Sequence, residues 1–178
     1  MNMTKKDKVL FAFLTVLITV HAYVFYSLYV VNGETLITIS GETTVIGAIN
    51  KIGGVYMCGT YLPIWALVLI EFAFAFTCEL LIGSPMSFKI AAKKVDFQND
   101  KPDHIEEEII KATVLVMVPL MSFIAACLYY PYYNGFNIFT LLANWLKLVC
   151  YNFPFAYFTQ LFFIQPFVRF IFGLIKKH

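Results

Sequence analysis

Four long apolar runs limit what this chain can fold into. They cover residues 9–31, 61–82, 109–130 and 141–164. Each run is close to the roughly 20 residues that a helix needs to cross the hydrocarbon core of a bilayer. The chain is 60% hydrophobic and only 13% charged, whereas about 25% of the residues of a typical soluble domain are charged. We therefore predict an all-α integral membrane protein with four transmembrane helices.

The basic residues predict how these helices are oriented. They cluster before the first run, between the second and third runs, and after the fourth: Lys5, Lys6, Lys8, Lys89, Lys93, Lys94, Lys101, Arg169, Lys176 and Lys177. Because cytoplasmic loops carry an excess of lysine and arginine, both termini and the central loop are expected in the cytoplasm. Topology and anionic lipid explain this charge, so we expect membrane lipids and no nucleic acid among the partners.

The second run is repeated in the fourth. Residues 71–85, EFAFAFTCELLIGSP, align with NFPFAYFTQLFFIQP, so that Glu71 matches Asn152 and Glu79 matches Gln160. Each acid is thus matched by an uncharged side chain that can still form hydrogen bonds. Because both units start in the cytoplasm, we predict two tandem parallel-repeat hairpins related by a pseudo-twofold axis along the membrane normal.

This repeat divides the chain into three parts. The first two-helix unit covers residues 1–82 and contains a long outer loop at 32–60. A cytoplasmic linker follows at 83–108. The second two-helix unit and a basic cytoplasmic tail cover 109–178. The predicted assembly is a four-helix bundle whose central seam lies between the two units.

The two longer connections also carry local signals. Alternating Thr and Ile residues in the outer loop favour a short hairpin that turns at Ser40-Gly41, followed by a short helix on the membrane interface. In the linker, Asp103 and Glu106 have the spacing of a capping box at the start of the third helix.

Polar residues inside the apolar runs are the candidate functional residues. His21 and Glu71 fall near the midpoints of the first and second runs, at one depth, where they could touch. An ionisable side chain at the bilayer centre costs roughly 2.5–3.5 kcal/mol on insertion scales, and such residues mark proton, ion or substrate paths. Glu71 is predicted to be a proton or cation site with His21 as its partner. The polar lining of the same seam would comprise Glu79, Asn152 and Gln160. The alternative is that these side chains only fix helix packing through hydrogen bonds.

Other sequence features add less. Pro119 and Pro154 lie inside the third and fourth runs, where a proline removes a backbone hydrogen bond and is expected to kink the helix. The four cysteines and three histidines form no metal-binding pattern, and no cofactor-binding or catalytic motif is present. We therefore expect no metal and no cofactor. An enzyme would have to depend on Glu71 and His21 alone.

The second unit resembles a known family. Residues 145–175, WLKLVCYNFPFAYFTQLFFIQPFVRFIFGLI, have a Trp-Leu-Lys entry, a proline within the helix and a Pro-x-x-Arg exit. This pattern is similar to that of a bacterial inner-membrane family known as domain of unknown function 2798, a two-helix unit. The residues that carry the resemblance are Trp145, Lys147, Pro154, Pro166 and Arg169. The first unit departs from the pattern, since Ala66 and Ala73 stand at the positions of the lysine and the first proline. The resemblance implies a multi-pass protein of the bacterial cytoplasmic (inner) membrane and supplies no catalytic residue.

Taken with the polar seam, these features favour a transport-related protein that passes a small solute or a proton. One bundle of four helices is thin for such a task, so a homo-oligomer or a partner membrane protein is expected. Two alternatives stay open. The first is a non-catalytic membrane scaffold or accessory subunit of a larger complex. The second is a membrane-embedded lipid-modifying enzyme.

Overall fold

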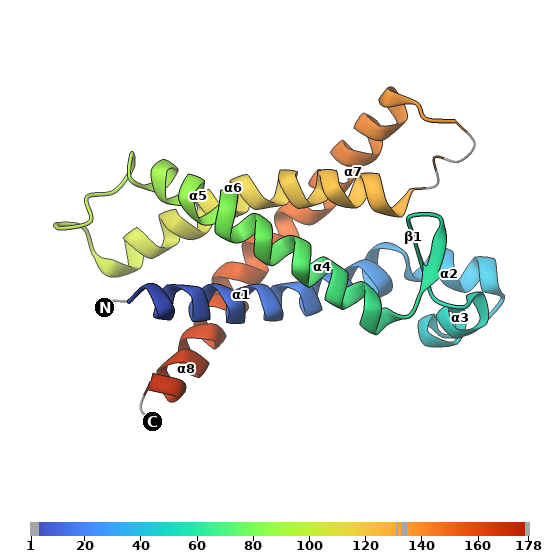
Figure 1. Ribbon diagram of the computed structural model, residues 1–178, viewed down its shortest axis with the longest axis horizontal. Helices are drawn as coiled ribbons and strands as arrows, with labels where there is room; N and C mark the ends of the chain where they lie inside the picture. The colour runs from blue at the N-terminus through green and yellow to red at the C-terminus, as the bar shows by residue number, and fades with distance from the viewer. Residues whose placement is uncertain (1–3, 131, 133–134, 177–178) are drawn as a thin grey trace.

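The computed structural model of the protein describes residues 4–130, 132 and 135–176 (Figure 1). Its helices and strands are, in chain order, α1 (Lys5–Phe25), η1 (Tyr26–Val31), α2 (Gly33–Ser40), α3 (Val45–Ile52), β1 (Val55–Met57), β2 (Thr60–Leu62), α4 (Ile64–Cys78), η2 (Glu79–Gly83), α5 (Ser84–Ala91), α6 (Pro102–Tyr129), α7 (Ile138–Thr159), η3 (Gln160–Ile164) and α8 (Gln165–Lys176). Segments labelled η are π-helical.

The predicted class is confirmed. Within the described residues, four helices are long and apolar enough to cross a membrane: Lys5–Val31, Ile64–Ala91, Pro102–Tyr129 and Ile138–Lys176. They contain the four predicted runs almost completely and extend beyond most of their ends. The one β element of this part of the chain is an antiparallel pair of short strands, β1 and β2.

The two ends of the molecule differ. The start of α1, the end of α8 and the α5–α6 connection lie at one end, which we call the terminal end (Figure 1). At the opposite end, the capped end, α2, α3 and the β-hairpin form a small cap (Figure 1). The fourth long helix, α7 to α8, crosses the others at an angle, so that the start of α7 and the end of α8 project from the bundle.

The buried apolar side chains form two separate cores. One core joins α1, η1, α3 and α4 and contains Val16, Val20, Val24, Leu28, Val45, Ile49, Leu67 and Ala75. The other joins α6 and α7 and contains Ile110, Val114, Val118 and Ala156. Leu141, Ile164, Val168 and Phe172 are buried but belong to neither core, and many of the other large apolar side chains of the long helices are exposed. In a bilayer such faces need no burial, because lipid tails are as apolar as the side chains.

The cap corrects the prediction for the outer loop. The segment expected to form a hairpin at Ser40-Gly41 is the helix α2, which ends where Gly41 adopts a left-handed conformation with φ of 69°. Its less exposed residues lie three or four apart, as in a helix: Gly33, Leu36, Ile37 and Ser40. Burial of this face overrides the strand preference of the Thr and Ile residues. The expected short helix is α3, and the hairpin follows it.

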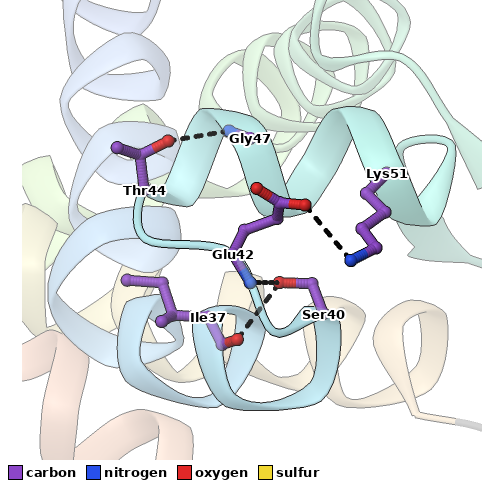
Figure 2. A network of polar contacts seen from close by, with 6 residues as sticks. All are labelled: Ile37, Ser40, Glu42, Thr44, Gly47 and Lys51. Atoms are coloured by element: carbon purple, nitrogen blue, oxygen red, sulfur yellow. Dashed lines mark hydrogen bonds and ion pairs between the residues drawn. The ribbon is translucent and has the colours of Figure 1, made fainter.

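Side chains fix the turn between α2 and α3 (Figure 2). Thr44 caps the start of α3, where its hydroxyl accepts a hydrogen bond of 3.1 Å from the Gly47 N–H. The Ser40 hydroxyl accepts from the Glu42 N–H at 3.2 Å, and the Lys51 Nζ lies 3.2 Å from Glu42 Oε1. The backbone N–H of Cys58, at the tip of the β-hairpin, donates to the Leu128 carbonyl of α6 at 2.9 Å. The cap is thereby attached to the second half of the chain.

The linker is also more helical than predicted. Residues 84–91 form α5, and α6 starts at Pro102, so that only residues 92–101 lack helical structure. The predicted capping box at Asp103 is wrong. Pro102 favours an extended conformation in the residue before it and occupies the first helical position itself, so Lys101 is the N-cap, without a side-chain cap. In the connection, hydrogen bonds from the Gln98 N–H and from the Asn99 amide hold the pKa of Asp96 below its usual value.

Two π-helical segments precede a proline. In η2 the N–H of Ser84 donates to the carbonyl of Glu79, and after η3 the N–H of Gln165 donates to the carbonyl of Gln160, five residues back in each case. The next residue of each helix is a proline, which has no N–H to continue the α-helical pattern. A π-helical turn accommodates such an interruption without ending the helix.

Pro119 and Pro154 lie inside the continuous helices α6 and α7. The carbonyl of Pro119 accepts a hydrogen bond of 2.8 Å from the indole N–H of Trp145, which ties α7 to α6. The kinks expected at both prolines stay a prediction.

Candidate functional site

A cavity of about 2470 Å³ lies against residues of both cores. Small-molecule pockets more commonly measure about 300–1,000 Å³. Asn32 and Tyr56 line this cavity at the capped end, and Gln98 and Arg169 line it at the terminal end. Its walls are mainly apolar, with polar side chains at a few positions. The cavity thus extends along the bundle between its two halves.

Four of the five predicted site residues line this cavity: Glu71, Glu79, Asn152 and Gln160. His21 is not among the lining residues. Its side chain is exposed, and its Nδ1 lies 2.7 Å from the Leu17 carbonyl of its own helix. The expected contact between His21 and Glu71 is therefore not formed.

The position of His21 has a simple geometric cause. On α1, the buried positions are Val16, Val20, Val24 and, in η1, Leu28, which repeat every four residues on one face. His21 directly follows one of them and is rotated by about 100° around the helix axis. The prediction that His21 lies near Glu71 used only the position of each residue along its helix. The His21 side chain points in a different direction around α1, so the two side chains do not meet.

One face of α4 and η2 supplies the acidic wall of the cavity. Leu67, Glu71, Phe74, Ala75 and Glu79 all line it, at the spacing of a single helical face. Because this helix continues to Ala91, its middle lies close to Glu79, whereas Glu71 is only seven residues from its start. The depth of each acid in the membrane stays a prediction. Glu71 lies toward the capped end, and Glu79 lies about 12 Å further along the helix at 1.5 Å per residue.

Tyr129 is the partner of Glu71. The hydroxyl of this last residue of α6 donates a short hydrogen bond to Glu71 Oε1, and both side chains are partly buried. Tyr129 was not among the predicted site residues, and no sequence motif points to its role. The contact joins α4 of the first half of the chain to α6 of the second.

The two amides bridge helices as well. The Gln160 Nε2 donates to the Thr19 hydroxyl of α1 at 2.8 Å, and the Asn152 Nδ2 donates to the Ser122 hydroxyl of α6 at 3.1 Å. Neither amide is hydrogen-bonded to the acid that it matches in the repeat. Thr19 and Ser122 were missed, although a hydroxyl residue inside an apolar run is a signal that could have found them.

Further hydrogen bonds join α1 and η1 to α7. The Tyr23 hydroxyl donates to the Asn152 carbonyl at 3.4 Å, and the Tyr26 hydroxyl donates to the Tyr151 carbonyl at 3.1 Å. The ring of Phe155 stacks on Tyr26 with centroids 4.0 Å apart. Tyr23 of α1 and Tyr26 of η1 therefore contact the backbone of α7 about one turn before Phe155, in the wall of the cavity.

Glu79 is held within its own helix. Its Oε1 accepts a hydrogen bond of 2.7 Å from the Ser84 hydroxyl. A Cβ at Gly83 would lie 2.6 Å from both Glu79 Oε2 and the Met117 sulfur. The absence of a side chain at Gly83 thus leaves room for the carboxylate against α6.

Two ion pairs lie at the terminal end. Arg169 of α8 donates a short hydrogen bond to Glu106 of α6. Lys176 Nζ lies 2.7 Å from Asp7 of α1, and so connects the end of the chain to its beginning. Exposed pairs of this kind contribute little each, typically about 0–1 kcal/mol. The described residues contain no group of three or more His, Cys, Asp or Glu side chains that could hold a metal ion.

These features define a multi-pass membrane protein with four apolar helices and a cavity whose mainly apolar walls carry a few polar side chains. Residues 108–176 match the model of a family described as a domain of unknown function (DUF2798). The match confirms the resemblance predicted from the sequence and covers α7, η3, α8 and most of α6. No curated protein and no solved structure matches the chain.

Proposed function

We propose that the protein is transport-related and that a small solute or a proton passes along the seam between its two halves. The observation that supports this function is the cavity, which reaches both ends of the bundle and is lined by Glu71 and Glu79. Ionisable residues inside membrane spans usually face such cavities and mark solute or proton paths. Glu71 would be the proton or cation site, and Asn152 and Gln160 would line the path.

The two halves would be tandem parallel-repeat hairpins. Each half contributes its own apolar core. Each also contains a π-helical segment that begins at Glu79 or Gln160, before a proline. A tyrosine from each half reaches the matching position of the other: Tyr129 donates to Glu71, and Tyr23 donates to the carbonyl of Asn152. These correspondences support a pseudo-twofold arrangement with the cavity on its axis.

The lysine distribution supports a cytoplasmic location for both termini, and the family match is compatible with the bacterial cytoplasmic membrane. A homo-oligomer or a complex with another membrane protein would complete the structure.

A membrane scaffold is the second candidate function. One observation favours it: the four polar side chains of the seam are all hydrogen-bonded within the protein, to Tyr129, Ser84, Ser122 and Thr19. In a scaffold these bonds would only hold the helices together. A lipid-modifying enzyme is less well supported, because that mechanism needed His21 beside Glu71.

Thiol labelling from each side of the membrane separates transport from scaffold. A cysteine replaces Thr19 in the seam or, as a control, the exposed Phe163 in η3. The native cysteines are first replaced by alanine: Cys58, Cys78, Cys127 and Cys150. A membrane-impermeant thiol reagent is then added to one side of sealed vesicles of known orientation.

For a transport path, Thr19→Cys reacts with reagent added to either side, whereas Phe163→Cys reacts from neither. A seam that stays unreactive from both sides, or that reacts from one side alone, contradicts passage of a solute and leaves a proton path or the scaffold.

A further inference from the structure

Glu71 and Glu79, on one face of the cavity wall, have no cationic partner in the described part of the chain. Glu71 and Glu79 accept hydrogen bonds from the hydroxyls of Tyr129 and Ser84, and neither takes part in an ion pair. Of the cations that line the cavity, Arg169 is paired with Glu106. The others, Lys8, Lys89 and Lys147, are exposed. The interior of the cavity therefore has acidic groups that a positively charged ligand could neutralise.

The walls beside Glu71 are apolar and aromatic. On α4, Leu67 lies one turn before it, and Phe74 and Ala75 lie one turn after it on the same face. Tyr129 brings a second aromatic ring to the carboxylate from α6. An aromatic ring attracts an organic cation through its electron-rich face, and this attraction strengthens where water is excluded. A carboxylate that is bonded to one aromatic side chain and lies one helical turn from another on the same cavity wall is thus suited to a cation with an apolar body.

Other ligand classes fit this site less well. A hard metal cation takes about six or more oxygen ligands, whereas the described neighbours of Glu71 supply one phenol and apolar side chains. An anion would be repelled by both acids. A small, strongly hydrated solute would leave most of the apolar wall uncovered, and the volume of about 2470 Å³ accepts a bulky molecule.

We propose, building on the transport function above, that the solute is a lipophilic organic cation that binds at Glu71. Its positive centre pairs with the Glu71 carboxylate, and its apolar groups lie against Phe74, Tyr129 and the walls of α1 and α6. Glu79, two turns further along the same face, provides a second acidic position on the path toward the terminal end.

Binding of tetraphenylphosphonium to the purified full-length protein tests this assignment. Equilibrium dialysis in uncharged detergent micelles measures its affinity, with protein-free micelles as the blank. Tetraphenylborate, which has nearly the same shape and the opposite charge, is the matched ligand control. The expected result is binding of the phosphonium that is about tenfold or more tighter than binding of the borate. Equal affinity for the two ions would overturn the proposal.

Three variants locate the site. Glu71→Gln should weaken phosphonium binding by about tenfold or more, whereas Glu34→Gln, on the exposed surface of α2, should leave it unchanged. Phe74→Leu retains the acid and should weaken binding by roughly threefold to tenfold, through loss of one ring. This variant keeps the test decisive if Glu71→Gln fails to fold. Loss of binding in Glu79→Gln but not in Glu71→Gln would refute Glu71 as the anchor.

The two proposals can fail separately. If phosphonium binding depends on Glu71 but Thr19→Cys does not react from both sides of the membrane, the binding site is supported and solute transport is contradicted. If Thr19→Cys reacts from both sides but the protein binds the phosphonium and the borate equally, transport is supported and the assignment of the solute as a lipophilic cation is contradicted.

Discussion

Removing the hydroxyl of Tyr129 should weaken the attachment between the two halves of the bundle. In Tyr129→Phe the ring stays in place and only the donor to Glu71 is lost. Hydrogen bonds between membrane helices contribute on average about 0.6 kcal/mol, with a maximum near 1.7 kcal/mol. No other described group donates to Glu71, which raises the expected cost. Its carboxylate also lines an open cavity, which lets water replace the phenol and lowers that cost. We therefore expect a loss of about 1 kcal/mol in the free energy of unfolding.

A double-mutant cycle measures this contact directly. Reversible unfolding in mixed detergent micelles gives the cost of Tyr129→Phe in the wild type and again in Glu71→Leu, where the acceptor is absent. The difference between the two costs should be about 0.6–1.7 kcal/mol. Tyr29→Phe is the control, because Tyr29 is exposed and its ring only stacks on Phe25. Equal costs of Tyr129→Phe in both backgrounds would refute the inferred link between the halves.

Three further substitutions test other parts of the structure by the same unfolding measurement. Gly54→Ala should destabilise the protein much more than Gly53→Ala, which should cost about 1–2 kcal/mol for its left-handed backbone. Both glycines have positive φ, but only at Gly54 would a Cβ lie 2.4 Å from a backbone oxygen; equal costs would contradict this packing. Gln160→Leu and Thr19→Val should show a coupling energy of about 0.6 kcal/mol, and additive effects would mean that their 2.8 Å contact does not stabilise the bundle. Glu71→Gln should leave the unfolding free energy unchanged or higher, since the amide keeps an acceptor and removes an acid from the membrane; a clear loss would favour the scaffold.

The four spans could be predicted because their cause is local. A helix that crosses lipid needs about 20 apolar residues regardless of its neighbours, and the apolar runs report that length directly. The same rule does not fix where a helix ends once it leaves the hydrocarbon. Residues 84–91 and 165–176 are helical although each segment has a proline at its second position, because a π-helical turn before each proline preserves the helix. Nothing in the apolar pattern encodes that turn.

The partners of the site residues could not be predicted for a different reason. Position along a helix sets depth, but contact also requires the correct direction around the helix and the crossing angle of its neighbours. His21 satisfied the first condition and failed the second. Tyr129 satisfied both, but its location at the end of an apolar run matched a tyrosine at the membrane surface. The sequence thus identified Glu71, Glu79, Asn152 and Gln160 because they are polar residues inside apolar runs. Their hydrogen-bond partners depend on tertiary packing and could not be predicted in this way.

The difference between the two halves bears on function. In the second half, Asn152 and Gln160 form hydrogen bonds to other helices at 3.1 and 2.8 Å. Amides are therefore sufficient to hold helices together at these positions. Glu71 and Glu79 stand at the matching positions of the first half and each accept one side-chain hydrogen bond from a neutral hydroxyl. An ionisable side chain deep in a membrane costs roughly 2.5–3.5 kcal/mol, several times the average of about 0.6 kcal/mol that one interhelical hydrogen bond returns. Packing alone gives no reason for the acids, whereas a positively charged ligand or a proton taken up in the cavity does.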